Sequence, residues 1–260
     1  MKIQVLLSCM HNDDFSIIHK SGLDKVSTLV VNQCNAEHER TVTDGLHTMI
    51  YTPTRGLSVS RNIAIENAST DICLISDDDE EFIPELENTI TKAYQDYPDA
   101  DVIIFNVFNR SKKLGDKPRR LGKYELLRVS SWQISFRLAS VKNRVFFDKN
   151  LGAGTGNGAS EENKFLLDCH KAGLKIFYVP VPIASVAQTS STWFNGYDKK
   201  FFFNRGKTTR YILGLPVSVF YAFHFLILKR KLYGKDISPL DAGKELFRGI
   251  FAKGINAKFD

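Results

Sequence analysis

Short apolar runs alternate with polar segments of helical spacing along the N-terminal half of the 260-residue chain. Residues 2–9 and 26–32 are apolar and partly β-branched, and residues 17–23 between them have the spacing of a short helix. A strand, a helix and a strand at this separation predict a βαβ unit with a parallel strand pair. Further strands are predicted at 47–51, 72–76, 102–108 and 175–181, and further helices at 57–68, 84–97 and 164–172. This order of elements predicts an α/β fold with a mostly parallel, Rossmann-like sheet flanked by helices.

The strand predicted at 72–76 ends in five consecutive acidic residues, 77–81. Adjacent carboxylates repel one another unless a cation neutralises them, so such a cluster either binds a hard metal ion or faces water. Ligands of open parallel sheets bind beyond the carboxyl ends of the strands, where these acids lie. We therefore expect Asp77, Asp78 and Asp79 to hold a metal ion, with a solvated acidic loop as the alternative.

Polar residues on two predicted helices are candidates for the same site. Arg61 and Asn62 lie on the helix at 57–68 and are placed to reach the edge of the sheet, although Arg61 has a local alternative in an ion pair with Glu66 or Asp71. Glu161 and Glu162 follow a glycine-rich segment, 152–158, whose spacing fits neither a phosphate loop nor a dinucleotide fingerprint. Helix capping is the alternative role for these two glutamates.

Net charge is +6 and the isoelectric point is about 9.0, which raises nucleic acid, anionic membranes and phosphorylated substrates as partners. Lys and Arg concentrate at 110–128 and in the C-terminal third, away from the acidic site, which favours a membrane surface. No nucleic-acid recognition module is recognisable, so we expect no nucleic-acid partner. The four cysteines are scattered without a CxxC pair, which indicates reduced thiols in a cytosolic protein.

The C-terminal region, 196–260, contains an apolar segment at 211–228 with basic residues on both sides. Eighteen residues barely reach the length of a bilayer span, and Gly214, Pro216 and His224 interrupt the segment. An interfacial helix is favoured over a core helix or a transmembrane helix. Residues 240–255 predict a second, basic amphipathic helix.

Four motifs in order resemble those of family 2 glycosyltransferases, the inverting nucleotide-sugar transferases with a GT-A fold. They are Gly-Leu-Ser-Val-Ser-Arg-Asn-Ile-Ala-Ile at 56–65, Ile-Ser-Asp-Asp-Asp at 75–79, Asp148 with Gly-Ala-Gly at 152–154, and Ser-Glu-Glu-Asn at 160–163 with Phe-Leu at 165–166. The resemblance covers about residues 1–195, which implies a GT-A domain there and leaves 196–260 as a helical, membrane-associating extension. The QxxRW motif of the family's polymerases is absent, so we expect transfer of one sugar per encounter.

The resemblance implies a role for each candidate residue. Residues 77–79 would be the DxD element that holds Mg²⁺ or Mn²⁺ against the donor diphosphate, and the ion would stabilise the departing nucleoside diphosphate. The expected donor-binding residues are Asn32, Arg61, Asp77 and Asp78. Asn32 stands where the family commonly has an Asp that binds uracil, and Gln188 stands where many members have a metal-binding His. Glu162 would be the general base, although the neighbouring Glu161 is an alternative.

The resemblance also implies partners. We expect a nucleotide-sugar donor, with a UDP-sugar favoured, and a lipid-linked or other saccharide acceptor in bacterial surface polysaccharide synthesis. The expected location is the cytoplasm, at the inner face of the cell membrane. A nucleotidyltransferase is one alternative, but the loop after the first strand lacks the glycine-rich, basic sequence that such enzymes carry. A catalytically silent glycosyltransferase-like scaffold is the other.

Overall fold

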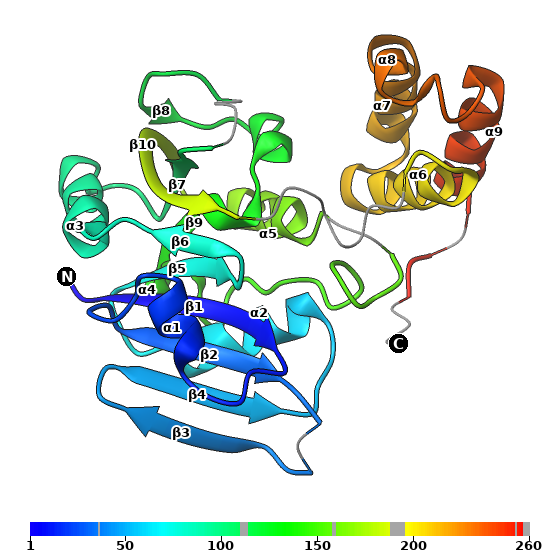
Figure 1. Cartoon of the computed structure of the whole chain (residues 1–260). Coiled ribbons are helices and arrows are strands. Elements are labelled where there is room, and N and C mark those ends of the chain that lie inside the picture. Colours follow the sequence, from blue (N-terminus) through cyan, green and yellow to red (C-terminus); the bar gives the residue numbers. More distant parts are fainter. Residues whose placement is uncertain (36, 110–113, 158–159, 188–195, 253, 257–260) are drawn as a thin grey trace. The chain divides into compact units, whose positions relative to one another are not determined.

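The computed structural model describes the whole chain except residues 36, 110–113, 158–159, 188–195, 253 and 257–260 (Figure 1). The chain forms two compact units, and each is described by itself. Unit 1 comprises Met1–Asp148 and Glu161–Gln188, and unit 2 comprises Lys149–Ser160 and Thr189–Asp260. Unit 2 thus includes residues 149–160 and starts its second segment at Thr189, whereas the expected boundary lay at residue 195.

Unit 1 is built on one ten-stranded sheet with the order β3-β4-β2-β1-β5-β9-β7-β10-β6, and β8 pairs with β10. The strands are β1 (Ile3–Met10), β2 (Thr28–Gln33), β3 (Arg40–Asp44), β4 (His47–Thr52), β5 (Ile72–Asp77), β6 (Glu80–Phe82), β7 (Val102–Val107), β8 (Arg119–Arg120), β9 (Ile134–Arg137) and β10 (Ile176–Val186). Strands β1, β2, β4, β5, β7 and β10 run in one direction, which confirms the expected mostly parallel sheet. All six residues of β2 and of β7 are buried, as the apolar runs predicted.

The helices of unit 1 are α1 (Ser16–Lys20), α2 (Leu57–Asn67), α3 (Leu86–Asp96), α4 (Leu138–Val141) and α5 (Glu161–Lys171), with 3₁₀ turns at Glu125–Arg128 and Ser131–Gln133. Helix α2 packs against β1 and β2. Its first turn is tied to the sheet, because the Gln33 side chain donates to the Gly56 carbonyl at 3.3 Å and the Ser60 hydroxyl bonds the Ser8 hydroxyl at 2.8 Å. These contacts fix the helix that carries Arg61.

The strand register brings the predicted site residues to one edge of the sheet. Asn32 on β2 lies opposite Cys9 on β1, and Asp77 on β5 lies opposite Ser8. The carboxyl ends of three neighbouring parallel strands therefore meet at the edge where such sheets bind ligands.

Unit 2 contains helices α6 (Lys199–Leu213), α7 (Leu215–Leu228), α8 (Arg230–Tyr233) and α9 (Pro239–Ile250) (Figure 1). The single apolar helix expected at 211–228 is wrong, because α6 ends at Gly214, whose φ is 77°, and a new helix starts at Leu215 with Pro216 in its first turn. Helices α6 and α9 cross closely at two glycines. A Cβ atom on Gly206 would lie 2.1 Å from the carbonyl oxygen of Leu246, and a Cβ atom on Gly249 would lie 2.1 Å from the carbonyl oxygen of Phe203. Over the described residues, each helix is too short or too polar to cross a bilayer.

Candidate active site

A buried arginine joins the two acidic motifs that the sequence placed far apart. The Arg61 side chain on α2 is fully buried, and its Nη2 donates to Asp77 Oδ1 at 2.7 Å while its Nη1 donates to Glu161 Oε1 at 3.0 Å. Burial acts to lower the pKa of the guanidinium, but the charges of Asp77 and Glu161 outweigh it and the net shift is upward. The end of β5 and the first residue of α5 are thus held by one cation.

The contacts of Asp77 occupy both of its carboxylate oxygens. Oδ1 accepts from Arg61, and Oδ2 accepts from the Ser131 hydroxyl at 2.9 Å. The backbone N–H of Asp77 donates to Glu80 Oε1 at 3.1 Å, which closes the turn between β5 and β6. Asp77 is therefore engaged by protein groups before any ligand binds.

Asp78 and Asp79 form the turn that follows Asp77. Partial burial of the Asp78 carboxyl, followed by the charge of Asp77, raises its pKa. The backbone of the turn is held from β10, because the Ala187 N–H donates to the Asp79 carbonyl at 2.8 Å. Two neighbouring carboxylates repel each other when both are ionised. A divalent cation bound between hard carboxylate oxygens would remove that repulsion.

The donor set for a metal is incomplete in the protein alone. Across the described residues, no three His, Cys, Asp or Glu side chains are arranged as a preformed metal site. Asp78 and Asp79 would hold the ion together with oxygens from the donor diphosphate and water, with Asp77 held behind them by Arg61 and Ser131. Gln188, which stands in place of the family's His, lies outside the described residues.

The two neighbouring glutamates on α5 differ in their surroundings. Glu161 is buried and ion-paired to Arg61. Glu162 is half-buried, and its Oε2 is shielded from solvent without a hydrogen-bond partner among the described residues. Burial, followed by the charge of Glu161, raises the pKa of the Glu162 carboxyl. Oε2 of Glu161 is likewise shielded from solvent without a hydrogen-bond partner among the described residues, but its Oε1 is held by Arg61, which leaves Glu162 as the glutamate of the pair without an ion-pair partner there.

Asn62, next to Arg61 on α2, holds the segment that precedes the glycine-rich region. Its Nδ2 donates to the Phe147 carbonyl at 2.8 Å, and its Oδ1 accepts from the Phe147 N–H at 2.8 Å. The Phe147 ring stacks on Phe165 of α5 with centroids 4.2 Å apart. The pair Arg61 and Asn62 therefore positions α5 from two sides.

Asn32 is buried and forms hydrogen bonds with the loop after β1. Its Oδ1 accepts from the Asn12 N–H at 3.2 Å, and its Nδ2 donates to the Asn12 carbonyl. A carboxylate at this position has no N–H to donate, which explains why an amide rather than an Asp fits here. The expected contact of Asn32 with a nucleotide base stays a prediction.

The sequence matches a known family over the part that carries Asn32, Arg61 and residues 77–79, but not Glu161 or Glu162. Residues 24–152 match the model of Glycosyl transferase family 2. Residues 24–152 form a family 2 glycosyltransferase domain. The protein is a glycosyltransferase, as the ordered motifs indicated. Among curated proteins, the comparison found no match.

Solved structures similar to this chain have the same fold. The S. aureus TarS 1–349 structure has a TM-score of 0.55 at 14% identity, covering 96% of this chain and 71% of that one. The same TarS fragment with UDP-GlcNAc has a TM-score of 0.54 at 14% identity, with coverages of 96% and 72%. The mannosyltransferase PcManGT from Pyrobaculum calidifontis with GDP-Man and Mn²⁺ has a TM-score of 0.52 at 14% identity, with coverages of 98% and 76%. At these identities the likeness shows the GT-A fold alone.

Sequence reasoning missed two members of the family 2 site. Ser131 lies in a Ser-Ser-Trp sequence without a catalytic pattern, and its role follows only from the pairing of β9 beside β5. Glu80 was part of the acidic run, but the structure buries it against the Asp77 N–H instead of exposing it. Its Oε2 has no partner among the described residues.

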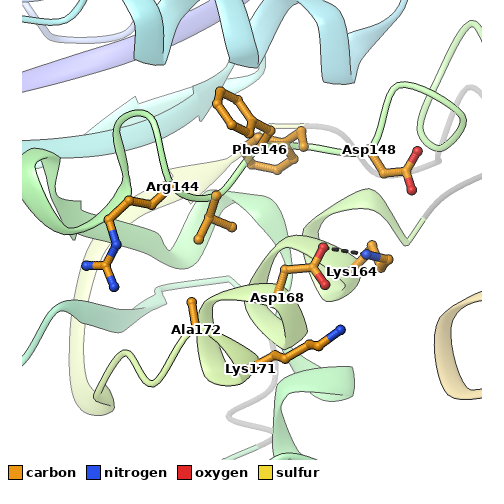
Figure 2. Close-up of a pocket in the computed structure, with 9 residues that line it drawn as sticks. Arg144, Phe146, Asp148, Lys164, Asp168, Lys171 and Ala172 are labelled. Carbon is orange, nitrogen blue, oxygen red and sulfur yellow. Dashed lines mark hydrogen bonds and ion pairs between the residues drawn. The ribbon is translucent and has the colours of Figure 1, made fainter.

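A separate pocket of about 520 Å³ lies beside α5 (Figure 2). Its charged lining residues are Arg144, Asp148, Lys164, Asp168 and Lys171, and Lys164 is ion-paired with Asp168. None of the residues bonded to Arg61 lines this pocket. The family 2 site is therefore identified by its carboxylates and not by this cavity.

Proposed function

We propose that this glycosyltransferase is an inverting enzyme that moves one sugar from a nucleoside-diphosphate sugar to a hydroxyl group of an acceptor saccharide. The observation that carries the proposal is the Arg61 bridge, because it puts the expected metal-binding strand end and the expected base helix at one site. In the proposed reaction a single displacement takes place, in which the acceptor oxygen loses its proton to a carboxylate and attacks the anomeric carbon opposite the diphosphate, which leaves. Inversion follows from that single step.

Each residue has a distinct part in this proposal. Glu162 accepts the proton of the attacking hydroxyl, while Glu161 keeps Arg61 and the start of α5 in place. Asp78 and Asp79 would hold Mg²⁺ or Mn²⁺, and a bound ion supplies positive charge for the leaving diphosphate. The turn at 77–80 orients the carboxylates of Asp78 and Asp79, and the hydrogen bonds of Asp77 hold the turn in place.

The donor and the acceptor are proposed from the similar structures and from charge. TarS binds UDP-GlcNAc and PcManGT binds GDP-Man with Mn²⁺, which supports a nucleotide-sugar donor, and a UDP-sugar remains the favoured one. We propose a lipid-linked saccharide of bacterial surface polysaccharide synthesis as acceptor, with the enzyme at the cytoplasmic face of the cell membrane. The basic, apolar C-terminal helices support that location.

The test measures nucleoside diphosphate released from UDP-, GDP- and dTDP-sugars in the presence of Mn²⁺, because sugar-nucleotide hydrolysis reports donor activation without the natural acceptor. The wild type should release diphosphate from one nucleotide class, and Asp79→Ala should not, whereas Asp44→Ala at the exposed end of β3 should match the wild type. Pyrophosphate release would indicate a nucleotidyltransferase instead. Absence of any release, together with no donor-induced rise in melting temperature, would indicate a silent scaffold.

A further inference from the structure

Helix α7 of unit 2 presents large apolar side chains to solvent. Phe220, Phe223 and Ile227 are 79%, 54% and 69% exposed. Their spacing puts them on one face of the helix, since residues three, four and seven apart lie on the same side. The opposite face of α7 carries the buried Ala222 and Phe225, which pack in the unit 2 core. Helix α7 thus uses one side for packing and leaves most of an apolar face exposed, although Phe223 also contacts the Phe247 ring of α9 edge-to-face with centroids 5.4 Å apart.

Exposed basic residues follow this apolar face directly. Lys229, Arg230, Lys231 and Lys235 are exposed, with Asp236 as the nearest acid in the sequence. We call Phe220, Phe223, Ile227, Leu228 and these four basic residues the docking face. Residues 196–260 contain 13 Lys or Arg and 5 Asp or Glu, whereas residues 1–195 contain 22 and 24. The positive charge of the whole protein therefore comes from the region that carries the docking face.

We propose that the docking face binds the surface of an anionic lipid bilayer, with α7 lying in the plane of the interface. Apolar side chains of an interfacial helix enter the boundary between headgroups and acyl chains, and adjacent basic residues attract anionic headgroups. Helix α7 has 14 residues. At about 1.5 Å per residue it is about 21 Å long, against a hydrocarbon core of about 30 Å, so it lies on a bilayer instead of crossing it.

This binding deepens the proposed function, because it would bring the enzyme to a lipid-linked acceptor. It depends on the proposed function only for the identity of that acceptor, since lipid binding needs no catalytic residue. The two ideas therefore fail separately: vesicle binding tests the docking face, and diphosphate release from a soluble nucleotide-sugar tests the catalytic site.

The experiment is cosedimentation of the full chain with phosphatidylcholine vesicles that contain or lack one-quarter phosphatidylglycerol. We expect binding to the anionic vesicles, weaker binding to the neutral ones, and loss of binding as salt rises, because salt screens the attraction. The double variant Lys229→Gln with Lys231→Gln should weaken partitioning about 25-fold, since each basic residue near an anionic surface contributes about a factor of five. The matched control is Lys92→Gln on α3, which should bind as the wild type does.

The apolar contribution is tested with Phe220→Ser combined with Ile227→Ser. Loss of two interfacial side chains should weaken partitioning about 100-fold or more, because burying each one is worth about a factor of ten or more. Leu46→Ser, at another exposed apolar position, is the control and should change nothing. Both double variants should keep wild-type diphosphate release, which reports that the catalytic site is intact.

Three results would overturn the proposal. One is equal binding to neutral and anionic vesicles, and another is binding that the double variants leave unchanged. The third is self-association of the wild type in sedimentation equilibrium that Phe220→Ser with Ile227→Ser abolishes, without any vesicle binding. That result would make the apolar face an interface between copies of this chain. The lysine variant keeps the proposal falsifiable even if the apolar variant folds poorly, because both lysines are exposed.

Discussion

Replacing Arg61 by Met removes the cation that Asp77 and Glu161 share while keeping most of the buried apolar stem. The two carboxylates do not contribute equally to the expected loss of stability. The Asp77 side chain is 24% exposed and keeps its bond from Ser131, whereas the Glu161 side chain is 6% exposed and loses its ion-pair partner. Removing one partner of a buried ion pair typically costs about 3–5 kcal/mol. Glu161 therefore determines most of the effect.

The protonation of Glu161 limits that cost. Keeping an ordinary glutamate neutral costs about 1.36 kcal/mol for each pH unit above 4.3, or about 3.7 kcal/mol at pH 7 and about 1.6 kcal/mol at pH 5.5. A buried glutamate without a cation takes up a proton when that is cheaper than remaining charged. We therefore expect Arg61→Met to lower the free energy of unfolding by about 3–4 kcal/mol at pH 7 and by about 1–2 kcal/mol at pH 5.5.

Urea unfolding followed by far-UV circular dichroism at both pH values measures this difference. Arg128→Met removes an exposed arginine and is the matched control, with an expected change within about 0.5 kcal/mol. The direction of the pH dependence is the sharper part of the test. The loss of unfolding free energy caused by Arg61→Met must become smaller as pH falls, because protonating the variant's glutamate then costs less free energy. A loss below about 1 kcal/mol at pH 7, or the same loss at both pH values, would refute a charge-neutralising role for Arg61.

Three further predictions concern the base, the metal and the helix crossing in unit 2. Burial, and after it the charge of Glu161, raises the pKa of Glu162 to about 8, so the rate of sugar transfer should rise as pH increases through that value. Glu162→Gln should lower kcat by about 10²–10⁴ and remove this rise with pH. Glu87→Gln, in the first turn of α3, is the control and should change neither kcat nor its pH dependence. EDTA should abolish diphosphate release from the wild type, and added Mn²⁺ should restore it. If saturating Mn²⁺ restored diphosphate release to the Asp79→Ala variant, Asp79 would not be a metal ligand. Gly206→Ala should lower the free energy of unfolding by about 3 kcal/mol or more, because a Cβ would lie 2.1 Å from a backbone oxygen of α9. Gly243→Ala, where a Cβ would lie 3.5 Å from Leu226, should be neutral or stabilising by up to about 1 kcal/mol in urea unfolding.

The parallel part of the sheet was predictable because its strands are buried on both faces. Such strands are nearly continuous apolar runs, and the expected segments 26–32, 47–51 and 72–76 agree with β2, β4 and β5 within two residues. The short antiparallel strands β6, β8 and β9 were not predicted. Two to four residues give no periodicity, and these strands are defined by their partners rather than by their own sequence.

The partners of Arg61 show where local reasoning about the site ends. Spacing along one helix predicts only near neighbours, and it suggested Glu66 or Asp71. The structure pairs Arg61 with residues 16 and 100 positions away, because sheet order places β5 beside β1 and α2 covers both β1 and β2. The ordered family motifs contained that proximity implicitly, since a family fold fixes which strand ends meet. The residue types alone did not indicate which of these residues lie close together.

The choice between Glu161 and Glu162 illustrates what a helix adds to a sequence of two identical residues. Consecutive side chains on a helix point about 100° apart, so one of them faces Arg61 while the other points elsewhere. The sequence cannot assign the two directions, because both residues are equally good in a first helical turn. Burial, and after it the charge of Glu161, raises the pKa of the Glu162 carboxyl, and a carboxyl of raised pKa is a stronger base when it is ionised. Under the proposed function, Glu161 would hold Arg61 in place while Glu162 accepts the proton, so the two adjacent acids would have separate parts.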